Sequence, residues 1–389
     1  MTADIDAARH AAHPRYVIDM AALTRNLEVL KGVSDRTGVR ILLAQKAFSC
    51  AAVYPLCAKY LAGTTASSLF EAKHGHDNFG GETHVFAPAF APGEMEELLE
   101  LVDHIVFNSP RQVALYGDMA RARGVSAGLR VNPETPVATT PAYDPCRPSS
   151  RLGTTRAVLD ESGGLPASVE GLHFHCLCEQ GVDELRKVLA GFETRFGDLL
   201  PRLKWLNMGG GHHITRRDYD VEGLVELLNA FRARHPRLAV YLEPGEAVAL
   251  DAGTLEAHVL EIQPCGADGV SNAILDVSAA CHMPDVLEMP YTPRVTGASA
   301  VSSGAAPGRF VYRFGGPTCL AGDEIGVYSF GHPLMEGETV VFEDMAIYSM
   351  VKNNTFNGIN LPDIALGRAD GTLETIRAFG YDDFACRLG

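Results

Sequence analysis

Residues 40–48 read Arg-Ile-Leu-Leu-Ala-Gln-Lys-Ala-Phe, a short apolar run that ends close to a lysine. The run Ile41–Ala44 has the length and composition of a buried strand, and Lys46 stands at its end. The preceding stretch Asp19–Gly38 carries leucines three and four residues apart, which is the spacing of one helix face. Asp19 is a suitable N-cap for that helix. These residues therefore predict a helix followed by a buried strand.

The alternation of strand-like and helix-like runs continues to about residue 250. Seven further strand candidates are Thr64–Ser67, Thr83–Ala87, His104–Asn108, Ala127–Asn132, Val169–His175, Lys204–Met208 and Ala239–Glu243. Helical patterns separate most of them, including Glu94–Leu101, Arg111–Arg123, Val182–Leu200 and Val221–Arg234. Eight parallel strands with intervening helices close into a (β/α)8 barrel, an α/β fold. An open doubly wound sheet is the main alternative, but no glycine fingerprint follows the first strand.

The pattern of apolar and polar residues changes after residue 250. Helical periodicity fades, and strand-like runs appear at Ala273–Val277, Arg309–Phe314, Glu324–Ser329 and Thr339–Phe342. The small-residue segment Thr296–Arg309 is expected to be a surface loop. The sequence therefore predicts a barrel domain over residues 16–250 and a mostly β domain over 251–389, to which residues 1–15 contribute.

The composition narrows the possible partners and the cellular location. The chain has 389 residues and a formal net charge of −15, which disfavours nucleic acid and anionic membranes and suits a cationic substrate. No apolar run is long enough to span a membrane, and the first residues do not form a signal peptide. Nine cysteines without framework spacing indicate reduced thiols. We expect a cytoplasmic protein.

Polar residues stand where the predicted strands end, which is where barrels of this kind place their active sites. Taken alone, Lys46 is more simply a solvated lysine, but a desolvated lysine there can form an imine. Gly209–Gly211 follow the seventh strand, and their backbone N–H groups could close around a phosphate, although a flexible turn is the simpler alternative. Glu243 ends the eighth strand, where a carboxylate can keep a pyridine nitrogen protonated, although a structural ion pair is an equal alternative.

Two histidines, His173 and His175, end the sixth strand and point the same way because they are two residues apart. One could stack on a flat cofactor ring. They could instead ligate a metal, with further candidates in Cys176, Cys178, His212 and His213. The cysteine spacing fits no zinc motif, so the sequence favours a site without metal. A lysine, a glycine loop, a histidine and a glutamate at strand ends of one barrel together predict a pyridoxal 5'-phosphate (PLP) site.

Longer motifs carry a family resemblance. They are AQKAF from Ala44, YDPCRPSSRLG from Tyr143, GLHFHCLCEQ from Gly171, LNMGGGHH from Leu206, YLEPGEAV from Tyr241, DVSAACHMPDVLEMPY from Asp276, GPTCLAGD from Gly316 and NNTFNGI from Asn353. Over nearly its full length the chain resembles the alanine-racemase-fold decarboxylases, which include ornithine and diaminopimelate decarboxylases. Within them it looks most similar to the carboxynorspermidine/carboxyspermidine decarboxylases.

The resemblance implies PLP-dependent decarboxylation of carboxynorspermidine or carboxyspermidine to norspermidine or spermidine. It implies that Lys46 binds PLP as a Schiff base, that His175 stacks on its ring, that Glu243 faces the pyridine nitrogen, and that Gly209, Gly210, Gly211 and Tyr348 lie at the phosphate. It also implies that Cys319 protonates the substrate carbon from across a homodimer interface. From the residues alone, Cys319 would more simply be a buried small side chain.

Departures from the family pattern bear on the substrate. Ornithine and diaminopimelate decarboxylases typically carry an arginine where this chain has Glu246, and ornithine decarboxylases carry an aspartate where it has Leu320. Asp285 aligns with a position that contacts the distal part of the substrate. We therefore expect Glu246 and Asp285 to receive a cationic polyamine tail. The two carboxylated triamines, which differ by one methylene, are not distinguished.

Several alternatives remain at this stage. The chain could be a decarboxylase for diaminopimelate, ornithine or arginine. A racemase is disfavoured by Glu243, and a PLP-binding module by the second domain with Cys319. A metal-dependent hydrolase would hold zinc and form no imine.

Overall fold

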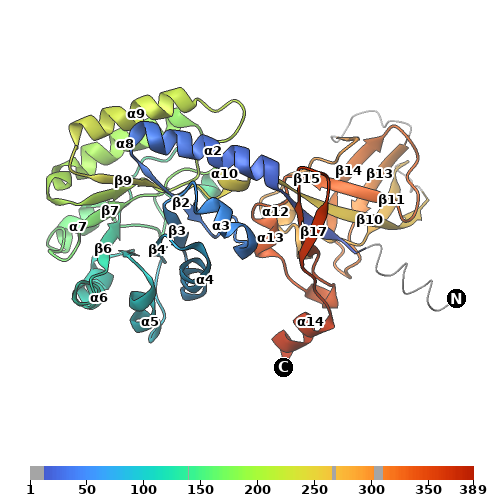
Figure 1. Cartoon of the computed structure of the whole chain (residues 1–389), viewed down its shortest axis with the longest axis horizontal. Helices are drawn as coiled ribbons and strands as arrows, with labels where there is room; N and C mark the ends of the chain where they lie inside the picture. Colours follow the sequence, from blue (N-terminus) through green and yellow to red (C-terminus); the bar gives the residue numbers. More distant parts are fainter. Residues whose placement is uncertain (1–12, 139, 265–268, 302–309) are drawn as a thin grey trace. The chain divides into compact units, whose positions relative to one another are not determined.

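The computed structural model describes residues 13–138, 140–264, 269–301 and 310–389 (Figure 1). The chain divides into two compact units, Thr24–Val248 and Met1–Leu23 with Ala249–Gly389. The domain boundaries expected from the sequence, at residues 16–250 and 251–389 with 1–15, stay a prediction. Among the described residues, no helix is long and apolar enough to cross a membrane.

Eight parallel strands close into a barrel in the first unit. They are β2 (Arg40–Ala44), β3 (Gly63–Ala66), β4 (Glu82–Phe86), β5 (His104–Phe107), β6 (Ser126–Arg130), β7 (Gly171–His173), β8 (Trp205–Asn207) and β9 (Ala239–Leu242). Each strand pairs with the next, and β2 closes the barrel by pairing Arg40 with Tyr241 and Ile41 with Leu242. The predicted (β/α)8 barrel is confirmed, and the open doubly wound sheet is excluded.

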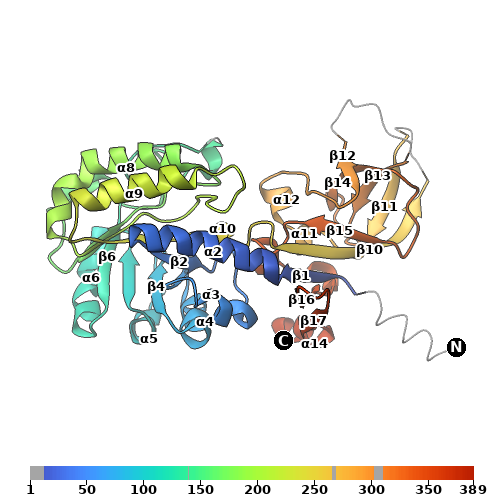
Figure 2. The same cartoon turned by 45° about the horizontal axis from the view of Figure 1, so that its top comes forward.

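Helices alternate with these strands and lie outside them (Figures 1 and 2). They are α2 (Met20–Thr37), α3 (Tyr54–Cys57), α4 (Leu69–Phe79), α5 (Glu94–Leu101), α6 (Pro110–Ala122), α7 (Arg156–Glu161), α8 (Val182–Phe196), α9 (Val221–Arg234) and α10 (Glu246–Ala249), with short 3-10 turns at Ala51–Val53, Pro141–Tyr143 and Gly197–Arg202. The predicted cap of α2 is confirmed, because Asp19 Oδ1 accepts hydrogen bonds from the N–H groups of Ala21 and Ala22 at 2.8 and 3.0 Å.

The interior near the amino ends of the strands is filled by Trp205, the first residue of β8. Its ring occupies space that two glycines leave open on the neighbouring strands. A Cβ added at Gly171 would lie 2.0 Å from the Trp205 ring, and one at Gly128 would lie 2.3 Å from it. Trp205 Nε1 donates to Ser126 Oγ at 2.9 Å, so the buried indole keeps a polar partner. This end of the barrel is therefore a packed core.

The second unit contains a nine-stranded sheet with the order β12-β14-β13-β11-β10-β1-β16-β17, and β15 pairs with β10. Its strands are β1 (Arg15–Asp19), β10 (Gly253–Gln263), β11 (Ser271–Leu275), β12 (Ala298–Ala300), β13 (Phe310–Gly315), β14 (Glu324–Phe330), β15 (Thr339–Glu343), β16 (Asp363–Gly367) and β17 (Leu373–Arg377). Its helical segments are α11 (Ala279–His282), α12 (Asp285–Glu288), α13 (Ser349–Lys352), a 3-10 turn at Phe356–Gly358, and α14 (Tyr381–Leu388).

This unit is mostly β, as predicted. Its sheet includes the N-terminal strand β1, and residues 1–12 lie outside the described residues. The sequence reading missed β10, β16 and β17. The predicted loop Thr296–Arg309 is wrong where β12 pairs with β14, and residues 302–309 lie outside the described residues. The eight cysteines that the structure describes are not paired in disulfides.

Candidate active site

Lys46 follows β2 at the carboxyl end of the barrel. Its side chain is exposed, yet desolvation by the surrounding protein lowers the pKa of its ammonium group. The Arg130 guanidinium acts in the same direction, whereas the charges of Glu243, Cys178 and Glu246 oppose the shift. A lowered pKa leaves more of the lysine as free amine, the form that attacks a carbonyl. Lys46 therefore has the environment that an imine-forming lysine requires.

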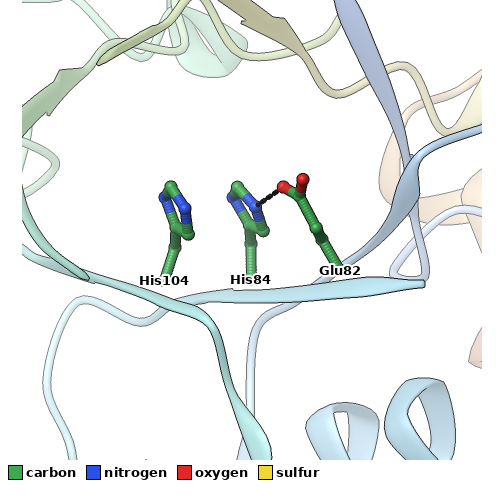
Figure 3. Close-up of side chains that lie close together, drawn as sticks. All are labelled: Glu82, His84 and His104. Carbon is green, nitrogen blue, oxygen red and sulfur yellow. Dashed lines mark hydrogen bonds and ion pairs between the residues drawn. The ribbon is translucent and has the colours of Figure 1, made fainter. Parts of the chain in front are cut away.

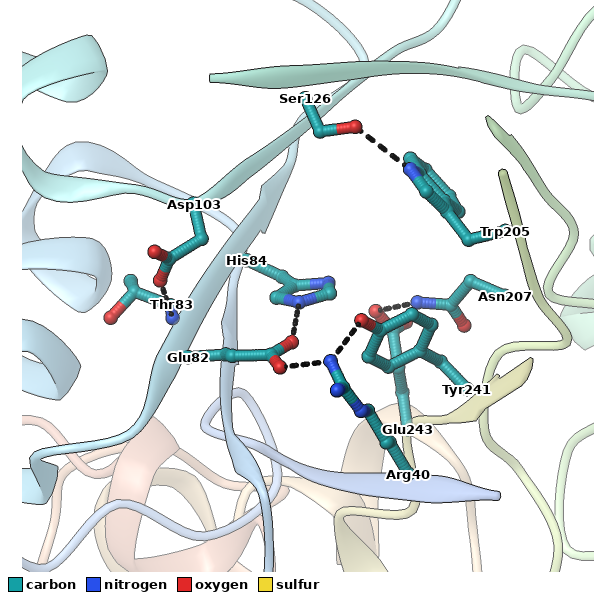
Figure 4. Close-up of polar contacts among 10 residues, drawn as sticks. All are labelled: Arg40, Glu82, Thr83, His84, Asp103, Ser126, Trp205, Asn207, Tyr241 and Glu243. Atoms are coloured by element: carbon teal, nitrogen blue, oxygen red, sulfur yellow. Dashed lines mark hydrogen bonds and ion pairs between the residues drawn. The ribbon is translucent and has the colours of Figure 1, made fainter. Parts of the chain in front are cut away.

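Glu243 follows β9 and is buried. Asn207 Nδ2 donates to Glu243 Oε1 at 2.7 Å, and His173 Nε2 lies 3.1 Å from Glu243 Oε2; Figure 4 draws the contact with Asn207. Burial alone raises the pKa of Glu243, but the charge and hydrogen bond of His173, together with Asn207, lower it well below its usual range. The pKa of His173 is itself lowered, chiefly by burial. The site thus holds an ionised, oriented carboxylate.

Arg130, the last residue of β6, was not singled out from the sequence. Its guanidinium carbon lies 4.5 Å from the centroid of the Phe86 ring, and its Nη2 donates to the His175 backbone oxygen at 3.0 Å. Desolvation lowers the pKa of Arg130 to about 10. Desolvation, with the charges of Lys46 and Arg130, also holds the pKa of His175 well below its ordinary value. The ring of His175 is therefore neutral at neutral pH.

The glycine loop after β8 uses two of its three amides within the protein. Gly209 N–H donates to Asn207 Oδ1, and Gly210 N–H donates to His175 Nδ1, both at 2.9 Å. The neutral His175 ring consequently carries its proton on Nε2. Gly211 N–H makes no hydrogen bond within the described residues. Of the three amides, that of Gly211 is the one directly available to an anion.

The same glycines are also needed for close backbone packing. A Cβ added at Gly210 would lie 2.0 Å from the Glu243 carbonyl oxygen, and one at Gly211 would lie 2.0 Å from the Leu177 carbonyl oxygen. Gly211 also has a φ of +83°, in the left-handed region that favours glycine. The sequence suggested a phosphate role or a flexible turn for these residues, and the structure adds a packing role.

Glu246, the first residue of α10, contacts a histidine that the sequence offered only as a metal ligand. Glu246 Oε2 lies 3.0 Å from His213 Nε2, an ion-pair distance, although the geometry is not that of a hydrogen bond. Burial alone would lower the pKa of His213, but the Glu246 carboxylate raises it. Glu246 is therefore already paired before any substrate binds.

Three of the expected site residues belong to the second unit. Asp285 begins α12, and its Oδ1 contacts Lys352 Nζ. Tyr348 precedes α13 with a φ of +51°, which is unusual for a residue other than glycine. The Cys319 side chain is exposed, and its backbone N–H donates to Asn357 Oδ1 at 2.9 Å. In this unit Cys319 is not the buried small residue that its type alone suggests.

The histidines and cysteines considered as alternative metal ligands do not form a cluster of three ligand atoms in the described part of the chain. A different group, Glu82, His84 and His104, places its ligand atoms within 4.8 Å of one another (Figure 3). These residues lie at the amino end of the barrel, and His84 Nε2 is 3.1 Å from Glu82 Oε2. The sequence reading did not anticipate this cluster.

The geometry of that cluster favours packing over ligation. The rings of His84 and His104 stack with centroids 4.1 Å apart and planes 11° apart, so their in-plane lone pairs run side by side and do not converge. Arg40 Nη1 contacts Glu82 and donates to Tyr241 Oη at 3.0 Å, so the carboxylate already has a cation (Figure 4). A bound metal would require these rings to turn apart.

Comparison with known proteins finds relatives that match nearly the whole chain. No family model matches it. It is 40% identical to the carboxyaminopropylagmatine decarboxylase of Synechocystis sp. over 97% of this chain and 95% of the relative. It is also 40% identical to the carboxynorspermidine/carboxyspermidine decarboxylase of Campylobacter jejuni over 96% of this chain and 98% of the relative.

Solved structures with similar folds include an enzyme of the same name as one of these relatives. The carboxynorspermidine decarboxylase of Campylobacter jejuni, determined with norspermidine, superimposes with a TM-score of 0.88 at 38% identity and covers 96% of this chain and 99% of that one. The diaminopimelate decarboxylase of Helicobacter pylori superimposes with a TM-score of 0.77 at 17% identity over 96% of each chain, which speaks for the fold alone.

The fold and these relatives place the chain among the alanine-racemase-fold decarboxylases, which are carboxy-lyases. At this level of identity and coverage, the chain belongs to the carboxynorspermidine/carboxyspermidine decarboxylase family.

Proposed function

We propose that the chain is a PLP-dependent decarboxylase of carboxynorspermidine and carboxyspermidine that forms norspermidine and spermidine. The assignment of PLP as cofactor rests on the arrangement of residues at the carboxyl end of the barrel. It combines a lysine whose pKa is lowered, an ionised Glu243 held by two neighbours, and a Gly211 amide without a partner among the described residues. These are the groups that bind an aldehyde, a pyridine nitrogen and a phosphate.

In this proposal each residue has one task. Lys46 binds PLP covalently through its Nζ, and His175 packs against the ring. Gly209, Gly210, Gly211 and Tyr348 surround the phosphate, with the Gly211 amide as donor. Glu243 holds a proton on the pyridine nitrogen, and Asn207 and His173 fix the direction of its carboxylate. When bound, PLP supplies the electron sink for the electron pair that the departing carboxylate leaves behind.

The proton that replaces carbon dioxide would come from the Cys319 Sγ. We place this thiol in the site of a second subunit, so that a homodimer forms two shared sites. The exposure of Cys319 supports this assignment, because an acid delivered to another chain must lie at the surface of its own. A cytoplasmic location, suggested by composition and free thiols, belongs to the same proposal.

The substrate assignment rests on the relatives and on charge. Carboxynorspermidine carries a secondary and a primary amine beyond its reacting carbon, and both are cationic at neutral pH. Glu246 and Asp285 would receive them, within a chain whose formal net charge is −15. Glu246 would exchange its contact with His213 for the substrate amine.

A second substrate is favoured by one comparison. The Synechocystis relative is named for carboxyaminopropylagmatine, and this chain is as similar to it as to the Campylobacter jejuni enzyme, at 40% identity for both. That compound ends in a guanidinium group rather than an ammonium. Carboxylates accept both, but a guanidinium prefers two parallel hydrogen bonds to one carboxylate.

The test is kcat/KM for the PLP-loaded protein on a panel of six compounds. The panel holds carboxynorspermidine, carboxyspermidine, carboxyaminopropylagmatine, meso-diaminopimelate, ornithine and arginine. We expect the highest value for a carboxylated triamine. A preference for carboxyaminopropylagmatine would select the second candidate, and a preference for one of the three simple amino acids would overturn the substrate assignment.

A further inference from the structure

The short helix α12 carries two carboxylates that share one lysine. Lys352 Nζ, at the end of α13, contacts both Asp285 Oδ1 and Glu288 Oε2. The side chains of Asp285, Lys352 and Glu288 are 15%, 32% and 59% exposed, so the contact with Asp285 is the more buried of the two.

The contact leaves part of Asp285 available. In the described part of the chain, no other hydrogen bond reaches its carboxylate, so Oδ2 can still accept from a cation. Asp285 and Glu288 are three residues apart on α12 and would repel each other without the lysine between them. Lys352 therefore fixes the direction in which Asp285 presents its second oxygen.

The backbone that carries Lys352 is held in place by buried hydrogen bonds. Tyr16 Oη donates to the His282 oxygen at 2.5 Å and lies 3.4 Å from the Ser349 oxygen, which ties α13 to α11 and β1. Just after α13, Asn354 N–H donates to the Cys281 oxygen at 2.9 Å. A lysine on such a frame has less freedom than one on a solvated helix face.

We propose that Lys352 is a positioning residue that determines specificity for the distal cation of the substrate. It orients Asp285 so that the second carboxylate oxygen, Oδ2, can accept from a cationic group of the tail. This inference rests on the proposed function, because it takes Asp285 as the residue that meets the tail. An ordinary exposed ion pair would contribute little to binding, so substrate affinity separates the two roles.

The test compares two compounds that share a reacting end. 2,4-Diaminobutyrate has the α-carbon and first amine of carboxynorspermidine but lacks its aminopropyl tail. In Lys352→Met we expect KM for carboxynorspermidine to rise about tenfold, a loss of roughly 1.4 kcal/mol. We expect kcat and the inhibition constant of 2,4-diaminobutyrate to stay within about twofold of wild type. Lys352→Arg should restore most of the affinity.

Two further variants decide how Lys352 acts. If it acts through Asp285, Lys352→Met should add no further loss to Asp285→Asn. Lys73→Met removes a lysine that contacts Glu97 on the surface of the barrel unit. It should change neither KM for carboxynorspermidine nor the inhibition constant of 2,4-diaminobutyrate. Wild-type turnover on the substrate panel tests the proposed function separately, and the comparison then uses whichever triamine is preferred.

Either of two results would overturn the inference. One is an unchanged KM in Lys352→Met. The other is a parallel rise in KM and in the inhibition constant of 2,4-diaminobutyrate, with a lower thermal midpoint and no rescue by arginine, which would make Lys352 a general structural residue.

Discussion

The two ends of the barrel hold the same pair of residue types at the same distance. At the carboxyl end His173 Nε2 lies 3.1 Å from Glu243 Oε2, and at the amino end His84 Nε2 lies 3.1 Å from Glu82 Oε2. Both histidines are buried. Only the first pair stands beside a lysine with a lowered pKa, so a buried histidine–glutamate contact does not by itself mark an active site.

The neighbours of each pair explain the difference. Glu82 is bound by the Arg40 guanidinium, and a second imidazole packs on His84, so the amino end is closed by permanent partners. Glu243 is held by the neutral amide of Asn207 and by His173, which orient it without a permanent cation. The carboxyl end therefore keeps an ionised carboxylate beside a lysine whose pKa is lowered, whereas the amino end uses the same residue types to fill space.

The largest effect should come from the lysine that distinguishes the two ends. Lys46→Ala should lower kcat by at least on the order of 10⁴-fold, because removing a covalent catalytic group has a cost of that size. The matched control is Lys204→Ala at the start of the seventh barrel strand, where Lys204 contacts Glu170. It should keep full activity. A Lys46→Ala enzyme with a tenth of wild-type activity would break the comparison.

The second-largest expected effect on kcat separates Glu243 at the carboxyl end from Glu82 at the amino end. Glu243→Gln should lower kcat about 10²- to 10³-fold, in the range measured for loss of one electrostatic catalytic contact. Glu82→Gln should leave kcat within about threefold but lower the thermal midpoint, because Arg40 and His84 lose their partner. Steady-state kinetics and thermal unfolding of both variants measure the change in kcat and in the thermal midpoint. Equal losses of kcat would mean that the amino end also takes part in the chemistry.

Glu246, which contacts His213 at the carboxyl end of the barrel, allows the two ends to be compared in substrate binding. Glu246→Gln should raise KM for the preferred triamine about tenfold and leave kcat nearly unchanged, as expected when a charged contact made before and during the reaction is lost. Glu170→Gln, which removes the acidic partner of Lys204, is the control and should have no effect. An unaltered KM in Glu246→Gln would remove Glu246 from the tail site.

The smallest effect concerns stability at acid pH. Burial lowers the pKa of His104 from 6.5 to about 3. Between these pH values the unfolded chain binds a proton there that the folded chain does not, so the free energy of unfolding falls as the pH is lowered through this window. His104→Phe keeps an aromatic ring and should reduce that slope by up to about 1.4 kcal/mol per pH unit. Denaturant unfolding between pH 4 and 7 measures it, and an unchanged slope would show that His104 is not held neutral.

The sequence was sufficient for the barrel because strand-like runs alternate with helical patterns along most of residues 40–243. Lys46 and Glu243, which follow such runs, could be placed at the carboxyl end of the barrel for the same reason. The predicted cap at Asp19 followed from local chemistry alone. These features depend on neighbours within a few positions, which a single sequence displays directly.

Other features depend on partners far apart in the chain. The amides of Gly209 and Gly210 donate to side chains, which a glycine run does not reveal. The contact between His213 and Glu246 joins the loops after two different strands. The long strand β10 was missed although buried and half-buried residues alternate along its first seven positions, and a bulge between Val259 and Glu261 breaks that alternation. In each case the tertiary partner determined the structure.

The most direct test of the account is to locate the cofactor linkage. The PLP-loaded protein would be reduced with borohydride, digested and mapped by mass spectrometry, with the Lys46→Ala protein treated in parallel. We predict a reduced pyridoxyl adduct on Lys46 and none in the variant. An adduct on another lysine, or no adduct in a protein that still decarboxylates its substrate, would contradict the placement of the active site at the carboxyl end of the barrel.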